Sequence, residues 1–137
     1  MARMSREELE AFLSRPHIAV LTTIRPDGSL HSTPVWYKYL EGRFYFWSDL
    51  DSVKVKDLAQ NPFASVCVAT RAEPYQYVSA EGPCEMTKDG LAERCLSICR
   101  RYYSEEAAKE FVDADLRQHD TTLLIMTPRR LMSEDSA

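Results

Sequence analysis

The sequence predicts a mainly β domain whose antiparallel sheet, with a few short helices, curls into a small closed or nearly closed barrel. The chain has 137 residues, of which 45% are hydrophobic, which is enough for one core but not for two. We therefore expect residues 1–137 to form a single domain. Six segments have the alternating or β-branched pattern of strands. Closure is the simplest way for so few strands to protect their edges.

The chain begins with a short helix and a hairpin. Ser5 and Glu8 have the spacing of a capping box, and Pro16 ends the helix that this box starts. The apolar, β-branched segment 17–23 is the first predicted strand. The Arg-Pro-Asp-Gly sequence at 25–28 follows as a tight turn, with proline at its second position and glycine at its fourth.

The next two predicted strands span residues 29–39 and 43–48. Pro34 cannot donate to a ladder, so it marks an edge, a bulge or a place where something other than a strand docks. The third strand carries four consecutive aromatic residues, Phe44–Trp47, and these cannot all point into one barrel. Alternate residues must face a helix, a ligand or a second subunit, and a homodimer is the simplest of these arrangements.

The remaining elements alternate between strands and helices. We expect a short crossover helix at 52–60, strands at 63–70 and 75–86, helices at 88–103 and 104–112, a last strand at 121–127 and a frayed tail at 133–137.

Composition excludes several functions. The net charge of -4 and the pI of about 5.4 argue against nucleic acid or an anionic membrane as partner, because both are held by excess lysine and arginine. The N-terminal segment has charges every few residues and no apolar core, so neither a signal peptide nor a membrane span is expected. A cytoplasmic location is the resulting expectation.

Cysteines and histidines give no clear metal or catalytic site. The four cysteines are expected to be reduced thiols. Cys95 and Cys99 share one face of a predicted helix and could hold a metal with Cys84 or His119, but we favour buried core positions and no metal. Hydrolase motifs are absent and the three histidines are scattered, so no catalytic residue is identified.

The start of the crossover helix is a candidate anion site. A helix N-terminus leaves backbone N–H groups without acceptors and carries a partial positive charge. Ser52, Lys54 and Lys56 add a hydroxyl and two ammonium groups there. Asp49 and Asp51 precede the helix, bring negative charge close to it and are expected to be solvated or capping groups.

Several segments together resemble the pyridoxamine 5'-phosphate oxidase-like split β-barrel family, which includes small flavin- and deazaflavin-dependent oxidoreductases. The similarity covers nearly the whole chain and is carried by VLTTIRPDGSLHSTPVWY, FYFWS, SVKVKDLAQNP, YQYVSAEGPCEM and TTLLIMTPRRL. It implies a six-stranded split barrel that forms a homodimer with two cofactor sites at the subunit interface.

The resemblance also implies which residues bind the cofactor. Ser52 and Lys54 match the family's phosphate-binding Ser-Arg-Lys run, while Val53 replaces its arginine, so one bidentate donor is missing. Either Lys56 supplies the missing charge, or the ligand carries its charge elsewhere. The remaining matches are two residues flanking the cofactor and five lining its ring: Trp47 and Ser48, then Ser32, Thr33, Pro34, Val35 and Trp36.

By this resemblance the protein is an oxidoreductase that transfers hydride between F420 or FMN and a small or medium organic substrate, with F420 slightly favoured because the short members resemble deazaflavin users. The first alternative is a non-catalytic flavin- or heme-binding module, and the second is a barrel without a ligand. Tyr75 and Tyr77 share a strand face; they either stack on a substrate ring or, as we favour, pack in the dimer interface.

Overall fold

The structure is a computed structural model that describes residues 3–135. These residues form four helices and eight strands. The helices are α1 (Arg6–Leu13), α2 (Val53–Gln60), α3 (Leu91–Cys99) and α4 (Glu105–Gln118). The strands are β1 (Ala19–Ile24), β2 (Leu30–Val35), β3 (Lys38–Leu40), β4 (Arg43–Asp49), β5 (Phe63–Ala69), β6 (Gln76–Thr87), β7 (Thr121–Met126) and β8 (Arg130–Asp135).

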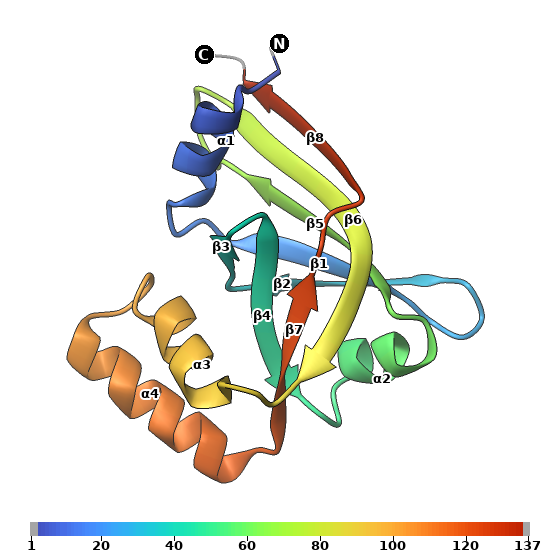
Figure 1. Cartoon of the computed structure of the whole chain (residues 1–137), viewed down its shortest axis with the longest axis vertical. Coiled ribbons are helices and arrows are strands. Elements are labelled where there is room, and N and C mark those ends of the chain that lie inside the picture. The colour runs from blue at the N-terminus through green and yellow to red at the C-terminus, as the bar shows by residue number, and fades with distance from the viewer. Residues whose placement is uncertain (1–2, 136–137) are drawn as a thin grey trace.

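All strands belong to one curled antiparallel sheet (Figure 1). The strand order is β2-β1-β5-β6-β7-β4-β3, and β8 pairs with β6 beside this path. The two end strands, β2 and β3, are consecutive in the chain, so the curl brings the sheet back towards its starting point. The mainly β class and the barrel-like sheet predicted from the sequence are confirmed.

Two of the predictions that bear on the strands were wrong. The strand expected at 29–39 is broken at Trp36 and Tyr37 into β2, which pairs with β1, and β3, which pairs with β4. The tail expected to fray at 133–137 is ordered up to Asp135 as part of β8, while residues 136–137 lie outside the described residues. These two changes raise the number of strands from six to eight.

Two hydrophobic cores lie on opposite faces of β4. Phe44 and Phe46 are buried inside the barrel, whereas Tyr45 belongs to the core under α3 and α4. Trp47 packs against that second core. The aromatic residues that cannot face the barrel are therefore covered by helices of the same chain, and they no longer argue for a homodimer.

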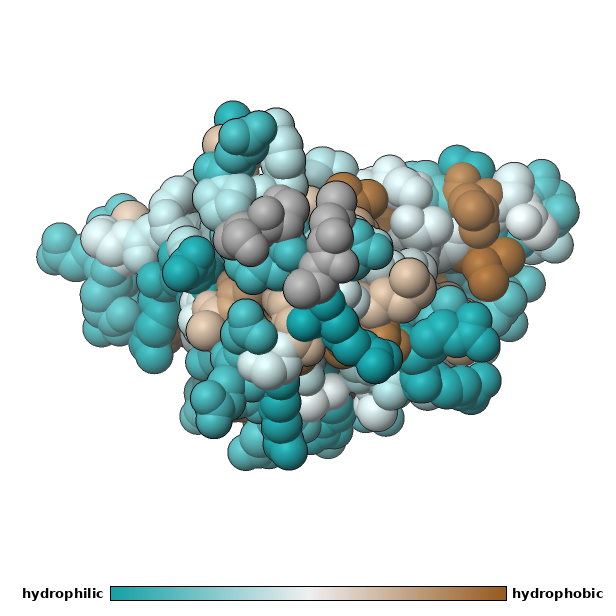
Figure 2. Space-filling model, turned by 90° about the horizontal axis from the view of Figure 1, so that it is seen from above, coloured by the Kyte–Doolittle hydropathy of each residue, from teal (hydrophilic) through white to brown (hydrophobic). Residues whose placement is uncertain are grey.

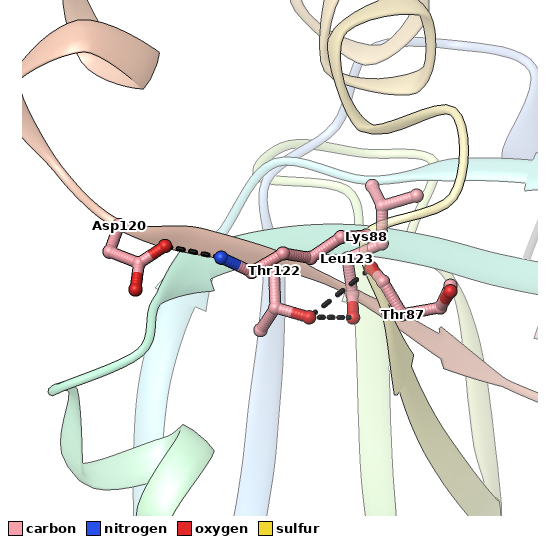
Figure 3. A network of polar contacts seen from close by, with 5 residues as sticks. All are labelled: Thr87, Lys88, Asp120, Thr122 and Leu123. Carbon is pink, nitrogen blue, oxygen red and sulfur yellow. Dashed lines mark hydrogen bonds and ion pairs between the residues drawn. The ribbon is translucent and has the colours of Figure 1, made fainter.

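The α3–α4 hairpin leaves the barrel after β6 and returns at β7. A polar network joins its two ends (Figure 3). The ammonium group of Lys88 contacts the Asp120 carboxylate, and the Thr122 hydroxyl donates to the Thr87 carbonyl at 3.2 Å. The hairpin is thus fixed at its base, which positions the residues that α4 presents to the barrel.

The long strand β6 changes neighbours at Gly82. Its first half pairs with β8 and its second half with β7, so the connection between β7 and β8 crosses it. The Arg129 N–H donates to the Glu81 carbonyl at 2.8 Å, and the Thr127 N–H donates to the Pro83 carbonyl at 3.0 Å. A Cβ atom on Gly82 would lie 2.1 Å from the Thr127 carbonyl oxygen, so only glycine fits.

The outer face of β2, β1, β5, β6 and β8 carries exposed apolar side chains. In the ladder, Pro34 lies opposite Val20, Val20 opposite Cys67, and Ser79 opposite both Cys67 and Met132. Val20 is 41% exposed and Met132 is 55% exposed. We call this row of Pro34, Val20, Cys67, Ser79 and Met132 the open sheet face.

The end of the molecule that carries α1 and β8 has a different character. Figure 2, which looks onto this end, shows mainly hydrophilic residues with hydrophobic ones scattered between them. The Met4 N–H donates to the Ser133 hydroxyl at 3.1 Å, which ties the start of α1 to β8. Within residues 3–135, no helix has the length and apolar character needed to cross a membrane.

The cysteines are free thiols, as expected. Cys95 and Cys99 are buried in the core under α3 and α4, and Cys84 is buried inside the barrel. Burial raises the pKa of both Cys84 and Cys95 to about 12. The interpretation of the Cys95 and Cys99 pair as core residues is confirmed, whereas Cys67 is exposed on the open sheet face.

Candidate functional site

A cleft of about 450 Å³ opens where β2 and β4 end, between the start of α2 and the side of α4. Figure 1 shows these two helices on opposite sides of the lower end of β4 and β7. The cleft is lined by Ile18, Pro34, Val35, Trp36, Trp47, Ser48, Asp49, Ser52, Lys54, Phe111 and Asp115.

The α2 side of the cleft is a helix N-terminus with two hydroxyl groups. Ser52 caps the helix, and its side chain accepts a hydrogen bond from the Val55 N–H at 3.3 Å. The Ser48 hydroxyl lies 2.9 Å from that of Ser52. The N–H groups of the first helical turn have no acceptors within the helix, and this end of α2 faces the cleft through Ser52 and Lys54.

Lys54 is the cation among the described residues that line the cleft. Burial lowers the pKa of Lys54, and the negative charge of Asp49 partly offsets this by raising it. On its other side, the Asp49 carboxylate lies 3.6 Å from the Nδ1 atom of His119. The partly desolvated ammonium group would gain more from a bound anion than a fully solvated one would.

The α2 helix is fixed to the barrel by a buried polar contact. The Thr23 hydroxyl on β1 donates to the Asp57 carboxylate at 2.8 Å, and both side chains are buried. Val55 and Leu58 pack into the barrel core from the same helix. The position of the helix N-terminus at the cleft therefore depends on interactions inside the barrel.

The opposite wall of the cleft is aromatic and centred on Trp36. The Trp36 ring stacks on Tyr102 with centroids 5.0 Å apart, and it contacts Phe111 at 5.5 Å and Trp47 at 6.1 Å. Tyr102 is held in turn, because its hydroxyl donates to the His17 carbonyl at 2.7 Å. The plane of Trp36 is thus set by the α3–α4 hairpin.

Asp115 supplies a carboxylate to this wall. Its Oδ2 accepts a hydrogen bond from the indole Nε1–H of Trp47 at 2.9 Å. Phe111 lies one helical turn earlier on α4, so the two side chains share a helix face. Phe111 is 39% exposed and forms part of the cleft's open rim.

Most of the predicted site residues lie together in this cleft: Pro34, Val35, Trp36, Trp47, Ser48, Ser52 and Lys54. Ser32 and Thr33 precede them on β2, and the Ser32 hydroxyl lies 2.8 Å from that of Thr22. Lys56 lines a separate cavity of about 420 Å³ with Asp51 and His119. Two residues apart on a helix are on nearly opposite faces, so Lys56 cannot reach the ligand position that Lys54 faces.

Sequence reasoning missed Ile18, Phe111 and Asp115 as cleft residues. The helix expected at 104–112 ended too early to include Asp115. The spacing of Phe111 and Asp115 would have placed them on one face if the helix had been extended. The need of a half-buried indole N–H for an acceptor was also a signal, although it does not say which residue supplies one.

Comparison with known proteins identifies the family of this chain. A sequence model described as pyridoxamine 5'-phosphate oxidase matches residues 5–132. The chain belongs to the pyridoxamine 5'-phosphate oxidase family. A pyridoxine/pyridoxamine 5'-phosphate oxidase from Bacteroides thetaiotaomicron is 32% identical over 66 residues, which are 47% of this chain and 31% of that relative. The match thus spans about a third of that relative's length.

Several solved structures share the fold of this chain. The conserved hypothetical protein Rv2991 from Mycobacterium tuberculosis has a TM-score of 0.82 and 27% identity, over 97% of this chain and 86% of that one. An F420 reductase has a TM-score of 0.71 and 23% identity, over 89% and 94%. The heme storage protein HutZ from Vibrio cholerae has a TM-score of 0.75 and 13% identity, over 92% of each chain. The resemblance to the split-barrel family predicted from the sequence is confirmed.

The cleft joins two chemically different surfaces. A helix N-terminus, two serines, Lys54 and Asp49 lie on one side, and a wall of indole and phenyl rings with Asp115 lies on the other. Such a cleft suits a ligand with a flat ring system and an acidic tail.

Proposed function

We propose that this protein is an oxidoreductase that binds F420 or FMN in the cleft and transfers hydride between that cofactor and a small or medium organic substrate. The observation that carries the proposal is the combination, in one cleft, of a helix N-terminus, which is suited to an anion, with an aromatic wall. Support also comes from the family and from the fold shared with an F420 reductase.

The residues present fit such a cofactor. Ser48, Ser52 and Lys54, together with the N–H groups at the start of α2, would hold an acidic tail or a phosphate. The β2 segment from Ser32 through Trp36 would line the ring, with Trp47 beside it. Val53, the first residue of α2, is 46% exposed and offers no donor side chain, so the phosphate site depends mainly on Lys54.

A bound flavin or deazaflavin supplies the hydride chemistry itself. The residues of this chain have three other tasks: to bind the acidic part, to orient the ring against the cleft wall and to exclude water. This division of labour accounts for a site that is built from serines, a lysine and aromatic residues.

We also propose that the protein is a homodimer, with the open sheet face as its interface. Val20, Cys67 and Met132 are exposed there, although they lie in the middle of paired strands. Pro34 belongs both to this face and to the cleft. A second copy seated on the face would therefore adjoin the cofactor and help to enclose it.

Cofactor binding can be followed through the protein's own fluorescence. The chain has two tryptophans, and both line the cleft, so quenching reports directly on occupancy. We would titrate the purified protein with F420, FMN and heme and record absorbance in parallel. F420 or FMN should bind and be reducible while bound. A Soret band in the heme titration, without binding of the other two, would instead support the heme-binding module, whose fold precedent is HutZ.

The lysine pair on α2 provides a matched test of the anion site. Lys54→Ala should weaken cofactor binding by about 1–3 kcal/mol, because a charge-assisted contact is lost. Lys56→Ala removes the same charge from the same helix but faces the other cavity, so it should leave the dissociation constant nearly unchanged. Equal effects of the two substitutions would contradict the proposed geometry, and a wild-type protein that binds none of the three ligands would contradict the proposed function.

A further inference from the structure

The α4 side of the cleft has a composition that the cofactor's acidic tail does not require. Beyond Trp36 and Trp47, which would border the cofactor ring, Phe111 presents aromatic surface there, and Asp115 adds a carboxylate. The cation Lys54 lies on the α2 side, close enough to Asp49 for the two charges to interact. The two walls of the cleft therefore differ in charge.

The carboxylate of Asp115 is held in place but can still accept further hydrogen bonds. Its Oδ2 accepts the indole N–H of Trp47 at 2.9 Å. A carboxylate has about four acceptor positions on its two oxygens, so one such contact leaves others for a ligand. Because the Trp47 contact holds the group against the wall, a ligand would not have to order it first.

The aromatic rings around this carboxylate favour the same kind of ligand. The face of an indole or phenyl ring carries negative electrostatic potential and attracts cations, and tryptophan does so most strongly. Phe111 is 39% exposed and lies one turn from Asp115 on α4, so ring and carboxylate can contact one bound molecule together. An anion bound here would be repelled by the Asp115 carboxylate. Among the described residues that line the cleft, α4 contributes no cation to offset this repulsion.

We infer that the α4 side of the cleft is the substrate subsite and that it selects planar aromatic molecules bearing a positive charge or an N–H donor edge over anionic ones. The inference deepens the proposed function. It rests on that function only in calling the bound molecule a substrate. The binding preference itself depends only on Asp115 and on the aromatic surface beside it, which Phe111 extends. The acidic part of the cofactor and the cationic part of the substrate would thus occupy opposite walls of one cleft.

Three planar probes of similar size test the preference: N-methylquinolinium as the cation, quinoline as the neutral ring and quinoline-2-carboxylate as the anion. Each is titrated into the full-length protein, with and without saturating cofactor, and followed by tryptophan fluorescence and calorimetry. The cation should bind about tenfold more tightly than the neutral ring, as expected for a cation on aromatic faces beside a carboxylate. The anion should bind most weakly.

A matched pair of variants assigns the preference to its residue. Asp115→Asn keeps an oxygen acceptor for the Trp47 N–H but removes the charge, so it should abolish the advantage of the cation and leave quinoline binding unchanged. Asp113→Asn makes the same change at an exposed position of α4 outside the cleft and should have no effect. Circular dichroism and the unfolding midpoint check that both variants are folded.

The outcomes separate this inference from the proposed function. Equal affinity for the cation and the anion, or an unchanged preference in Asp115→Asn, would overturn the inference even if F420 or FMN binds. Cation selectivity that depends on Asp115, in a protein that binds neither cofactor, would support the subsite and overturn the proposed function.

Discussion

Gly82 shows how one residue fixes the path of two strands. The connection from β7 to β8 passes so close to it that a Cβ atom would lie 2.1 Å from the Thr127 oxygen and 2.9 Å from the Arg129 nitrogen. Both contacts are with backbone, which cannot rotate away as a side chain can. The hydrogen bonds on either side, from Arg129 to Glu81 and from Thr127 to Pro83, hold the connection in place.

Gly82→Ala should therefore destabilise the protein by about 1–3 kcal/mol, the usual cost of overpacking, measured as a shift in the urea unfolding midpoint. Gly42→Ala is the matched control, because a Cβ there meets nothing within 4 Å but the residue has a φ of +78°. It should cost about 1–2 kcal/mol through backbone strain alone. A Gly82→Ala protein as stable as wild type would show that the connection does not cross Gly82 closely.

His17 should make stability depend on pH. Burial lowers the pKa of His17 below its usual value, and the charges of Arg15 and Arg101 lower it further. The folded protein thus disfavours the protonated ring, whereas the unfolded chain protonates it near pH 6.5. The stabilising contribution is complete above that pH and is lost as the pH falls below it.

The free energy of unfolding should accordingly decrease between pH 7.5 and pH 5.5. His17→Phe keeps a ring at a position that stacks on Phe12, with centroids 4.6 Å apart, but cannot titrate. Its stability should fall less over the same pH range, as measured by urea unfolding. An identical pH dependence in the two proteins would remove His17 as a cause.

At the scale of elements, the side chains of β8 alternate between the core and the surface, although its sequence does not alternate between apolar and polar residues. Leu131 packs against the barrel core and Ser133 is buried, while Arg130 and Met132 are exposed. Leu131→Ala should cost about 1–2 kcal/mol, because the side chain is only partly buried and loses part of the usual burial energy.

Arg130→Ala, one residue earlier and on the opposite face, should change the free energy of unfolding by less than about 0.5 kcal/mol. This difference between neighbours is the signature of a strand. Equal and negligible effects at both positions would mean that the segment does not contribute to the sheet.

The elements that the sequence predicted well are those whose signals are local. Ser5 and Glu8 form the capping box expected of them, and Ser52 caps α2. Pro34 lies on β2, a strand at the end of the sheet order, where a missing N–H is tolerated. The wrong predictions concern segments whose structure depends on distant partners. The segment 130–135 is a strand because it pairs with the free edge of β6, and no pattern within these residues indicates this.

The candidate site was predictable to the same extent. Residues on consecutive segments, from Pro34 to Trp36 and from Trp47 to Lys54, could be grouped from the chain itself. Phe111 and Asp115 come from a helix far along the sequence, and the fold of the α3–α4 hairpin brings them to the cleft. Lys56 was included because it is close to Lys54 in sequence, although helix geometry separates the two.

At the scale of the whole molecule, formation of the proposed dimer can be measured through a residue of the open sheet face. Cys67 is the exposed cysteine among the four, and it lies in the middle of that face. A thiol reagent should label it rapidly in dilute protein and slowly at concentrations at which the dimer forms. The three buried thiols should react only in denaturant, since thiolates are the reactive species and burial suppresses them.

Val20→Lys should prevent this protection, because it places a charge in an apolar interface. Light scattering should then show a monomer. Ala92→Lys, at an exposed position of α3, is the control and should leave the assembly unchanged. Labelling of Cys67 at a rate independent of protein concentration, with a single monomeric mass, would contradict the proposed interface.

The closed base of the α3–α4 hairpin has a consequence for engineering. Thr87 and Leu123 are paired directly in the ladder of β6 and β7, and the Lys88–Asp120 contact seals the point where the chain leaves and re-enters the barrel (Figure 3). The segment between Thr87 and Leu123 can therefore be exchanged as one unit. Grafting a different helical hairpin onto the same two endpoints should exchange one wall of the cleft while the α2 wall and the barrel stay as they are, so that new specificities can be selected on an unaltered scaffold.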